Sequence, residues 1–345
     1  MHFGSDNTSG VAPEILEAIA RANGGFAPSY GADSLTARVE KRFSELFEHE
    51  VSVFLVGTGT AANSLGLAAI VKPYEAVFCH EASHIYWDEC AAPEFFTGGA
   101  KLMPVRGDFG KLHEGAVRRA IGFIRPGFHH QAQPAALSLS QLTEFGTAYR
   151  ADEIGALSEV ARERGMAVHM DGARFANAVV STGESPADLT WKNGVDVMSF
   201  GASKNGAMGV EAVILFDKAR VGALPSLRKR SGQLFSKGRF LAAQMDAYLE
   251  DDLWRRHAEQ ANAMARRLEE GLRAIPEIEI SYPVEGNEVF CVLPQAIEKR
   301  LRDAGAVFHP WNAPGDSMPG DKVRLVTSFV TTAEEVDTFL EVARG

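Results

Sequence analysis

Two short stretches, His169-Met170-Asp171-Gly172-Ala173-Arg174 and Ser199-Phe200-Gly201-Ala202-Ser203-Lys204, decide the fold predicted for this chain. Each lies against an apolar run that is typical of a buried strand. Lys204 follows Asp171 by 33 residues, which leaves room for a helical crossover between two parallel neighbours. We therefore expect the carboxylate and the amine to meet at the carboxyl ends of adjacent strands.

An acid and a lysine placed in this way are the groups that pyridoxal 5′-phosphate chemistry requires. The lysine forms a Schiff base with the aldehyde of the cofactor, and the acid keeps the pyridine nitrogen protonated so that the ring accepts electrons. Two simpler explanations stand beside this one. Asp171 is also suited to capping the helix that opens at Gly172, and Lys204 to an exposed turn.

Strand-like and helix-like stretches alternate from residue 51 to about residue 216. This alternation predicts an α/β fold with a mostly parallel sheet, right-handed crossovers and helices on both faces. Residues 239–274 are predicted to form one long helical stretch leading to a small C-terminal α/β domain of two strand–helix pairs. We place the boundary so that residues 1–245 form a large cofactor-binding domain, with the N-terminal segment, and residues 246–345 form the small domain.

Size and composition exclude several classes of protein. The 345 residues, 46% hydrophobic and 23% charged, are typical of a globular protein with a large core. The net charge of −10 and the lack of a long basic stripe argue against nucleic-acid binding. We recognise no signal peptide, no apolar run long enough for a bilayer, and no disulfide or metal-ligand pattern among the three cysteines. We expect a cytoplasmic protein that binds no membrane and no metal.

The turn Gly57-Thr58-Gly59-Thr60 separates a predicted strand from a predicted helix. Glycines allow an anion to approach the backbone, and a helix N-terminus offers free N–H groups, so the turn is a candidate phosphate site. It also resembles a degraded dinucleotide fingerprint, with Glu81 roughly 20 residues further on, where such a site places an acid. A nicotinamide-dependent oxidoreductase therefore remains open as an alternative.

Several other side chains are candidates for ligand contacts. The imidazole of His84 is suited to stacking on a flat ring and to proton transfer, although a lone histidine is more often a packed or surface residue. Arg174 and Arg324 are suited to binding a carboxylate through paired hydrogen bonds, or to pairing with a structural acid. The short basic stretch that contains Arg228, together with Lys237, is either a solvated helix end or a phosphate clamp.

These residues together resemble the L-threonine aldolases of the fold type I, aspartate-aminotransferase-like superfamily. The Asp-Gly-Ala-Arg and Ser-Lys pair, in this order and at this separation, is the specific part of the resemblance. The matching motifs extend over nearly the whole chain: Ser5-Asp6-Asn7-Thr8, Tyr30-Gly31, Gly57 to Asn63, His84, His169 to Arg174, Ser203-Lys204 and Val323 to Thr327.

The resemblance implies a carbon–carbon lyase that cleaves L-threonine, L-allo-threonine and related β-hydroxy-α-amino acids, with phenylserine a further candidate, to glycine and an aldehyde. It implies a homodimer or homotetramer with shared active sites. Lys204, Asp171 and His84 are the implied catalytic residues, with His84, or a water that it orients, as the base for the β-hydroxyl proton. The implied cofactor contacts are Thr58, Gly59, Thr60, His84, Asp171, Arg174, Ser203, Lys204, Arg228 and Lys237, and the implied substrate contacts are Ser5, Tyr30, Arg174 and Arg324.

One departure from the family pattern concerns the base. The family commonly has Glu-Asn-Thr-His-Asn after its central strand, whereas this chain has Ser140-Gln141-Leu142-Thr143-Glu144, with Thr143 in place of the histidine. Other reactions on the same scaffold, namely β-elimination, transamination and serine hydroxymethyl transfer, use the same lysine and acid and remain alternatives.

Overall fold

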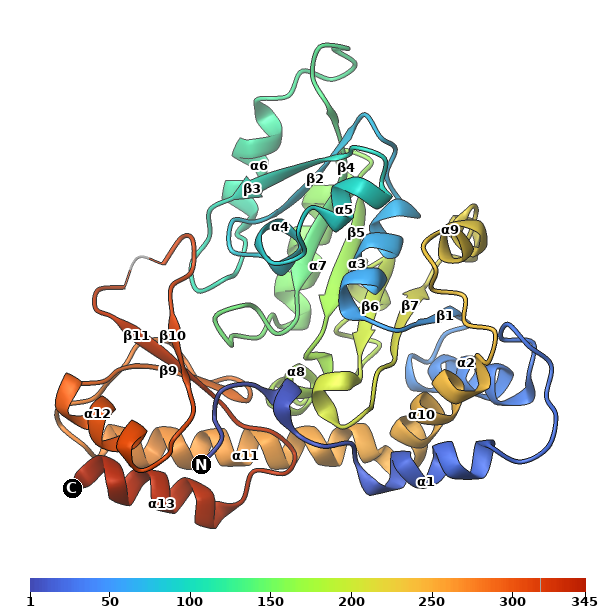
Figure 1. The fold of residues 1–345 in the computed structure, drawn as a ribbon. Coiled ribbons are helices and arrows are strands. Elements are labelled where there is room, and N and C mark those ends of the chain that lie inside the picture. The colour runs from blue at the N-terminus through green and yellow to red at the C-terminus, as the bar shows by residue number, and fades with distance from the viewer. Residues whose placement is uncertain (317) are drawn as a thin grey trace.

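The computed structural model describes residues 1–316 and 318–345, and a seven-stranded sheet forms its centre (Figure 1). The strand order is β1-β7-β6-β5-β4-β2-β3, and β7 alone runs antiparallel to its neighbours. The predicted α/β fold with a mostly parallel sheet is therefore confirmed. The strands are β1 (Ser52–Val56), β2 (Glu75–His80), β3 (Lys101–Val105), β4 (Gln133–Ser140), β5 (Ala167–Gly172), β6 (Val197–Gly201) and β7 (Glu211–Leu215).

Apolar residues on both sides of the central strands explain why helices cover this sheet. All six residues of β5 and all five of β7 are buried, which requires packing against both faces. The helices that follow the strands supply this packing. The thirteen α-helices in the described ranges are α1 (Pro13–Ala22), α2 (Ser34–Leu46), α3 (Gly59–Ala68), α4 (His84–Trp87), α5 (Ala92–Phe96), α6 (Glu114–Gly122), α7 (Ala151–Arg162), α8 (Phe175–Thr182), α9 (Leu224–Arg230), α10 (Arg239–Leu249), α11 (Leu253–Arg273), α12 (Gln295–Asp303) and α13 (Ala333–Arg344).

A second sheet of four antiparallel strands, in the order β10-β11-β9-β8, forms the C-terminal unit. Two of its strands, β9 (Glu288–Val292) and β11 (Lys322–Val326), are the ones that the sequence predicted, each followed by its predicted helix. The other two, β8 (Glu279–Ile280) and β10 (His309–Trp311), were not predicted. They are two and three residues long, too short to show a period of their own.

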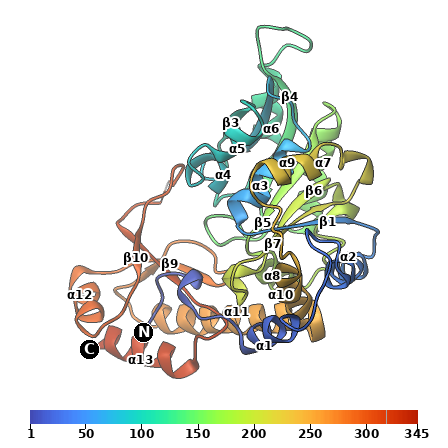
Figure 2. The same cartoon turned by 45° about the vertical axis from the view of Figure 1, so that its right-hand side comes forward.

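The single long helix predicted over residues 239–274 is wrong. The chain ends α10 at Leu249, passes through Asp251 and Asp252 with φ of 48° and 54°, and begins α11 at Leu253. Helix α10 is buried on nearly every side, whereas α11 is amphipathic, so the chain has to change direction between them. Aspartate tolerates the left-handed conformation that this bend requires. Both views show α11 beside α8 and α13 (Figure 1, Figure 2).

The first residues of the chain pack on the C-terminal unit rather than on the large sheet. The backbone N–H of Phe3 donates to Val307, and its carbonyl accepts from Val326, both at 2.8 Å. The Phe3 ring lies edge-on to Phe339 at 5.0 Å, inside the core of that unit. The N-terminal segment, which the sequence analysis grouped with the large domain, thus links the two units.

Candidate active site

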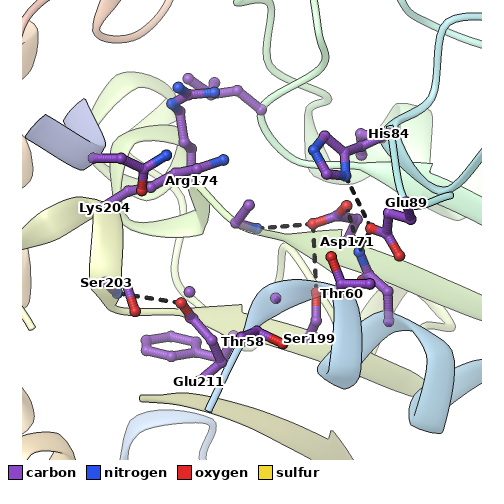
Figure 3. A pocket seen from close by; sticks show the side chains of 18 of the residues that line it. Thr58, Thr60, His84, Glu89, Asp171, Arg174, Ser199, Ser203, Lys204 and Glu211 are labelled. Atoms are coloured by element: carbon purple, nitrogen blue, oxygen red, sulfur yellow. Dashed lines mark hydrogen bonds and ion pairs between the residues drawn. The ribbon is translucent and has the colours of Figure 1, made fainter. Parts of the chain in front are cut away.

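A cavity of about 390 Å³ opens at the carboxyl ends of β4, β5 and β6. Asp171 and Lys204 both line it, as do Thr58, Gly59 and Thr60, Arg174, Ser203 and His84 (Figure 3). The tertiary structure thus brings the predicted acid and lysine to one cavity, although 33 residues separate them in the chain.

Asp171 is the last polar residue of β5 and is 6% exposed. One carboxylate oxygen accepts hydrogen bonds from the Ala173 N–H at 3.0 Å and the Ser199 hydroxyl at 3.4 Å, and the other accepts from Asn63 at 2.8 Å. Burial opposes the charged form, but the positive charges of His84 and Lys204 outweigh it and hold the pKa of Asp171 below its ordinary value. The side chain is therefore a fixed anion that faces the cavity.

Lys204 lies in a one-turn helix, Ser203–Asn205, directly after β6. The turn is held from both sides: Glu211 on β7 accepts from the Ala202 N–H at 2.7 Å, and the Asn205 side chain donates to the carbonyl of Trp254 at 2.7 Å. These contacts position the lysine at the cavity. Glu211 was not predicted, and its pKa is raised by burial to about 6.

His84 lines the cavity as the first residue of α4, and a buried acid positions it. Its Nδ1 lies 2.9 Å from Oε1 of Glu89, which is 4% exposed. The Asn63 amide joins this pair to the strand end, because it donates to Glu89 at 2.7 Å and to Asp171 at 2.8 Å. The hydrogen bond that the ring donates to Glu89 is the main reason that the pKa of His84 is raised. Glu89 was missed because its five-residue spacing from His84 matches no common motif.

The cluster of His84, Glu89 and Asp171 also brings three potential ligand atoms within 4.8 Å of one another. Hydrogen bonds within the cluster and to Asn63 account for this spacing.

The turn Gly57-Thr58-Gly59-Thr60, a candidate phosphate site, leads from β1 into α3. Thr58 is the N-cap, and its hydroxyl accepts from the Ala61 N–H at 3.2 Å. The segment after α9 packs on this turn, because the Gln233 side chain accepts from the Gly57 N–H at 2.9 Å, and the Gln233 N–H donates to the Arg228 carbonyl at 3.0 Å.

The guanidinium of Arg228 carries a buried Nε without a hydrogen-bond partner among the described residues. Burial alone lowers its pKa, since no acid compensates the charge. A half-buried guanidinium with an unpartnered donor is a group that a phosphate can satisfy. The described residues therefore fit pyridoxal phosphate at both ends, with Asp171 near the ring and Thr58 to Thr60 near the phosphate.

Arg174 lines the cavity but is already paired with two acids. Its Nε and Nη2 donate to Asp6 at 2.8 and 3.0 Å, and its Nη1 lies 3.2 Å from Glu288. These acids hold the guanidinium in place, and their charges raise the pKa of Arg174 against the effect of burial. Arg174 thus pairs with structural acids and also lines the cavity, so both interpretations of this arginine apply to the same side chain.

The remaining predicted contacts do not line the cavity of the chain that the structure describes. Ser5 caps a short helix next to Asn7, which does line the cavity. Tyr30 is 50% exposed, with the Lys229 ammonium 5.0 Å from its ring centre. Arg324 lies 3.7 Å from Glu288 and stacks near Trp311, and both Arg228 and Lys237 lie outside as well.

Thr143, which stands where the resemblance implies a histidine, lines the cavity with its hydroxyl committed elsewhere. Its hydroxyl donates to the Phe109 carbonyl at 3.1 Å and lies 2.8 Å from the Thr147 hydroxyl. Its neighbour Glu144 also lines the cavity and was not predicted. Only the tertiary structure shows which of Thr143 and Glu144 keeps an available hydrogen-bonding atom, since the sequence does not reveal the partners of two adjacent polar residues.

The sheet order removes the basis of the nicotinamide alternative. A dinucleotide site needs the acid-bearing strand beside the strand that precedes the glycine turn. Here β1 pairs with β7 at the sheet edge, whereas β2, which precedes Glu81, lies between β4 and β3. Glu81 is 3.5 Å from Arg106 and does not line the described cavity.

Comparisons with known proteins agree with this geometry. A profile of the family described as beta-eliminating lyase matches residues 2–296. A low specificity L-threonine aldolase of Pseudomonas aeruginosa is 42% identical over 334 residues, which cover 97% of this chain and 94% of that protein. A structure of Leishmania major threonine aldolase superposes with a TM-score of 0.91 at 29% identity, covering 99% of this chain and 98% of that one. An aspartate aminotransferase of Thermus thermophilus, with a TM-score of 0.71 at 20% identity over 99% of this chain and 91% of that one, shares the fold.

Proposed function

The chain belongs to the beta-eliminating lyase family, and we propose that it is a pyridoxal phosphate-dependent L-threonine aldolase. It cleaves L-threonine, L-allo-threonine and related β-hydroxy-α-amino acids to glycine and an aldehyde. The observation that carries the proposal is the cavity in which Asp171, Lys204 and the N-terminus of α3 face one ligand space. The 42% identity to a low specificity L-threonine aldolase over nearly the whole chain supports the substrate class.

When bound, pyridoxal phosphate acts as an electron sink for the bond that breaks next to the substrate's amine. Lys204 is the residue to which its aldehyde attaches, and Asp171 holds the proton on its ring nitrogen. Thr58, Gly59, Thr60 and Ser203 hold the phosphate together with Arg228 and Lys237. The unpartnered Nε of Arg228 and the free N–H groups of α3 support this assignment.

The substrate carboxylate is held by Arg174, with Arg324, Ser5 and Tyr30 as further contacts. A guanidinium fixes a carboxylate through two parallel hydrogen bonds, which sets the orientation of the substrate. The acids that pair with Arg174 support this role, since they fix its fork at the cavity wall before a ligand arrives.

His84 is the residue that contacts the cofactor ring and orients the β-hydroxyl group. Its hydrogen bond to Glu89 supports this role because it holds the imidazole in one orientation. Substrates with an aliphatic β-substituent and phenylserine are both to be tested, since either substituent would leave as part of the aldehyde.

The active enzyme is a homodimer or homotetramer in which neighbouring chains complete each site. Two facts support shared sites: Tyr30 and Lys237 lie outside the cavity of their own described chain, and the loop around Tyr30 exposes Phe26 fully. Large exposed aromatic side chains on one loop are typical of a subunit interface.

The cytoplasm is the proposed location, supported by three free cysteines, of which Cys79 and Cys291 are buried. No helix in the described ranges combines the length and apolar character needed to traverse a bilayer. The proposed domain boundary stays near residue 245, before the bend at Asp251 that separates α10 from α11.

The test is incubation of the purified protein with pyridoxal phosphate and L-threonine, followed by product analysis. Acetaldehyde and glycine in equal amounts support the aldolase. A 2-oxo acid in their place would instead indicate β-elimination or transamination. The Lys204→Ala variant should lose both turnover and the visible absorbance of the bound cofactor, and turnover without this lysine would refute its role.

A further inference from the structure

We propose that Glu144 is the catalytic base that accepts the proton of the substrate's β-hydroxyl group, an inference that rests on the proposed aldolase function. Glu144 lines the same cavity as Asp171 and Lys204. Its Oε2 is buried and has no hydrogen-bond partner in the described chain. A buried, unpartnered carboxyl oxygen at a ligand cavity is suited to a substrate hydroxyl, since leaving it unpaired is costly.

Thr143 cannot take over the task of the family's histidine, although it occupies that position. Its hydroxyl is committed to the Phe109 carbonyl and to Thr147, and it also accepts from the Phe145 N–H at 3.3 Å. A Cβ at Gly110 would lie 2.6 Å from Thr143, so the backbone packs directly on this side chain. The hydroxyl therefore belongs to the loop and is not free to bind a substrate.

Glu144 is anchored through one oxygen and free at the other. Oε1 accepts from the Ser140 hydroxyl at 2.7 Å and from the His84 N–H at 2.8 Å. These two bonds fix the plane of the carboxyl group and leave Oε2 as the available acceptor. The sequence pattern hides this arrangement because Ser140 ends β4 and Glu144 lies in the loop four residues later, where no regular period relates the two side chains.

The charges around Glu144 suit a group that exchanges a proton near neutral pH. Burial raises its pKa to about 7, and the negative charge of Asp171 on β5 adds to the rise, while the bonds from Ser140 and the His84 N–H oppose it. The other titratable groups that interact with it are Cys79 on β2 and Tyr149 before α7, both neutral at pH 7 because burial raises the pKa of each.

His84 is less suited to accepting this proton. Its Nδ1 is committed to Glu89 at 2.9 Å, and this hydrogen bond raises the pKa of the imidazole, which favours the ring as a donor. When the carboxyl of Glu144 is ionised, by contrast, its Oε2 can only accept, and this oxygen has no partner among the described residues. His84 then donates to the hydroxyl oxygen and Glu144 takes the proton, so the two residues divide the task.

The step balances without a further reactant. The β-hydroxyl O–H bond breaks, and its proton moves to Oε2 of Glu144. The O–H electron pair becomes the second bond of the aldehyde carbonyl as the Cα–Cβ bond breaks. The electron pair of that bond stays with the amino-acid fragment, which takes a proton at Cα to become glycine, while Glu144 returns its proton to solvent.

The Glu144→Gln variant tests this role, because glutamine keeps the acceptor for Ser140 and His84 but cannot take a proton. We expect cleavage of L-threonine to slow on the order of 10²-fold or more. Exchange of the glycine α-proton with deuterated water should stay near the wild-type rate, since glycine carries no β-hydroxyl group. Wild-type cleavage by the variant, or an equal loss of both reactions, would overturn the proposal.

A matched control is Glu81→Gln, the same chemical change at a glutamate outside the cavity. It should leave both reactions unchanged. If the wild-type protein exchanges glycine protons but cleaves no β-hydroxy-amino acid, the proposed aldolase function is refuted. That outcome is distinct from failure of the role proposed for Glu144, which requires an active wild-type enzyme.

A second readout needs no turnover. Infrared titration of the cofactor-free protein should reveal the C=O band of a protonated carboxyl group that disappears as the pH rises through about 7. This band should be missing from Glu144→Gln and present in Glu81→Gln. Glu211, whose pKa is raised to about 6, contributes a band of its own that both variants should keep. If Glu144→Gln retains the component that disappears near pH 7 at its wild-type amplitude, the assignment of that carboxyl to Glu144 is contradicted.

Discussion

Two carboxyl groups face the same cavity from neighbouring strand ends, and their surroundings shift their pKa values in opposite directions. Asp171 near the end of β5 has partners for both oxygens and nearby positive charges, which hold its pKa below the ordinary value. Glu144 after β4 has one oxygen without a partner and lies near Asp171, and its pKa is raised to about 7. One acid is thus built to stay charged and the other to exchange a proton. Such divided pairs are the usual way in which one site obtains both a fixed charge and a base.

The largest effect is expected where the fixed charge is removed. Asp171→Asn should lower kcat for L-threonine cleavage on the order of 10²- to 10³-fold, because an amide does not stabilise a protonated ring nitrogen. Steady-state kinetics measure the loss, and the visible spectrum checks that the cofactor stays bound. A near-normal kcat with full cofactor occupancy would break the contrast between the two acids.

The second effect concerns stability and the other acid. Because the folded-state pKa of Glu144 lies above its unfolded value, wild-type protein loses stability as the pH rises from about 4.5 to about 7. Glu144→Gln does not ionise, so at pH 8 it should exceed wild type in unfolding free energy by up to about 3 kcal/mol, with little difference at pH 4. Urea denaturation at both pH values measures this. A pH-independent difference would show that Glu144 ionises normally.

A third prediction extends the contrast to a cation, since the Nε of Arg228 is also buried without a partner. Arg228→Met should weaken cofactor binding by about 1.5 to 3 kcal/mol, the worth of a hydrogen bond to a charged group. The cofactor-free variant should be no less stable than wild type, because the buried charge has no compensating acid. Fluorescence titration with pyridoxal phosphate measures the affinity, and thermal unfolding of the apoprotein is the control. A large stability loss with unchanged affinity would assign Arg228 a structural role.

The smallest effect is expected at the support of His84. Glu89→Gln should lower the pKa of His84, because the hydrogen bond that the ring donates to the carboxylate is the main cause that raises it. NMR titration of the imidazole measures this directly. A histidine with a raised pKa adds stability that is present at low pH and is lost as the pH rises through the raised value. Glu89 also has a raised pKa, caused by burial, and its contribution has the same sign. Wild type should therefore exceed the variant by more at pH 5 than at pH 8, by about 1 kcal/mol.

Much of the fold could be predicted because its signals are local. The buried runs of β5 and β6, the turn that caps α3 and the strand–helix pairs after residue 287 all depend on the period of apolar residues within one element. The bend at Asp251 could not, since the residues on both sides of it favour helix, and only the packing of α10 against α1 and α2 and of α11 against α8 and α13 decides where the chain turns.

The same division holds for the site. Sequence alone predicted pyridoxal phosphate chemistry, because an acid and a lysine that each follow an apolar run are expected at neighbouring strand ends whatever the rest of the fold. Only the tertiary structure decided that Glu89 reaches His84, that Asn63 joins them to Asp171, and that Glu144 rather than Thr143 keeps a free oxygen at the cavity. The physical reason is that a residue's type sets what it can donate or accept, whereas its burial and partners, which come from distant parts of the chain, set whether that capacity is still available.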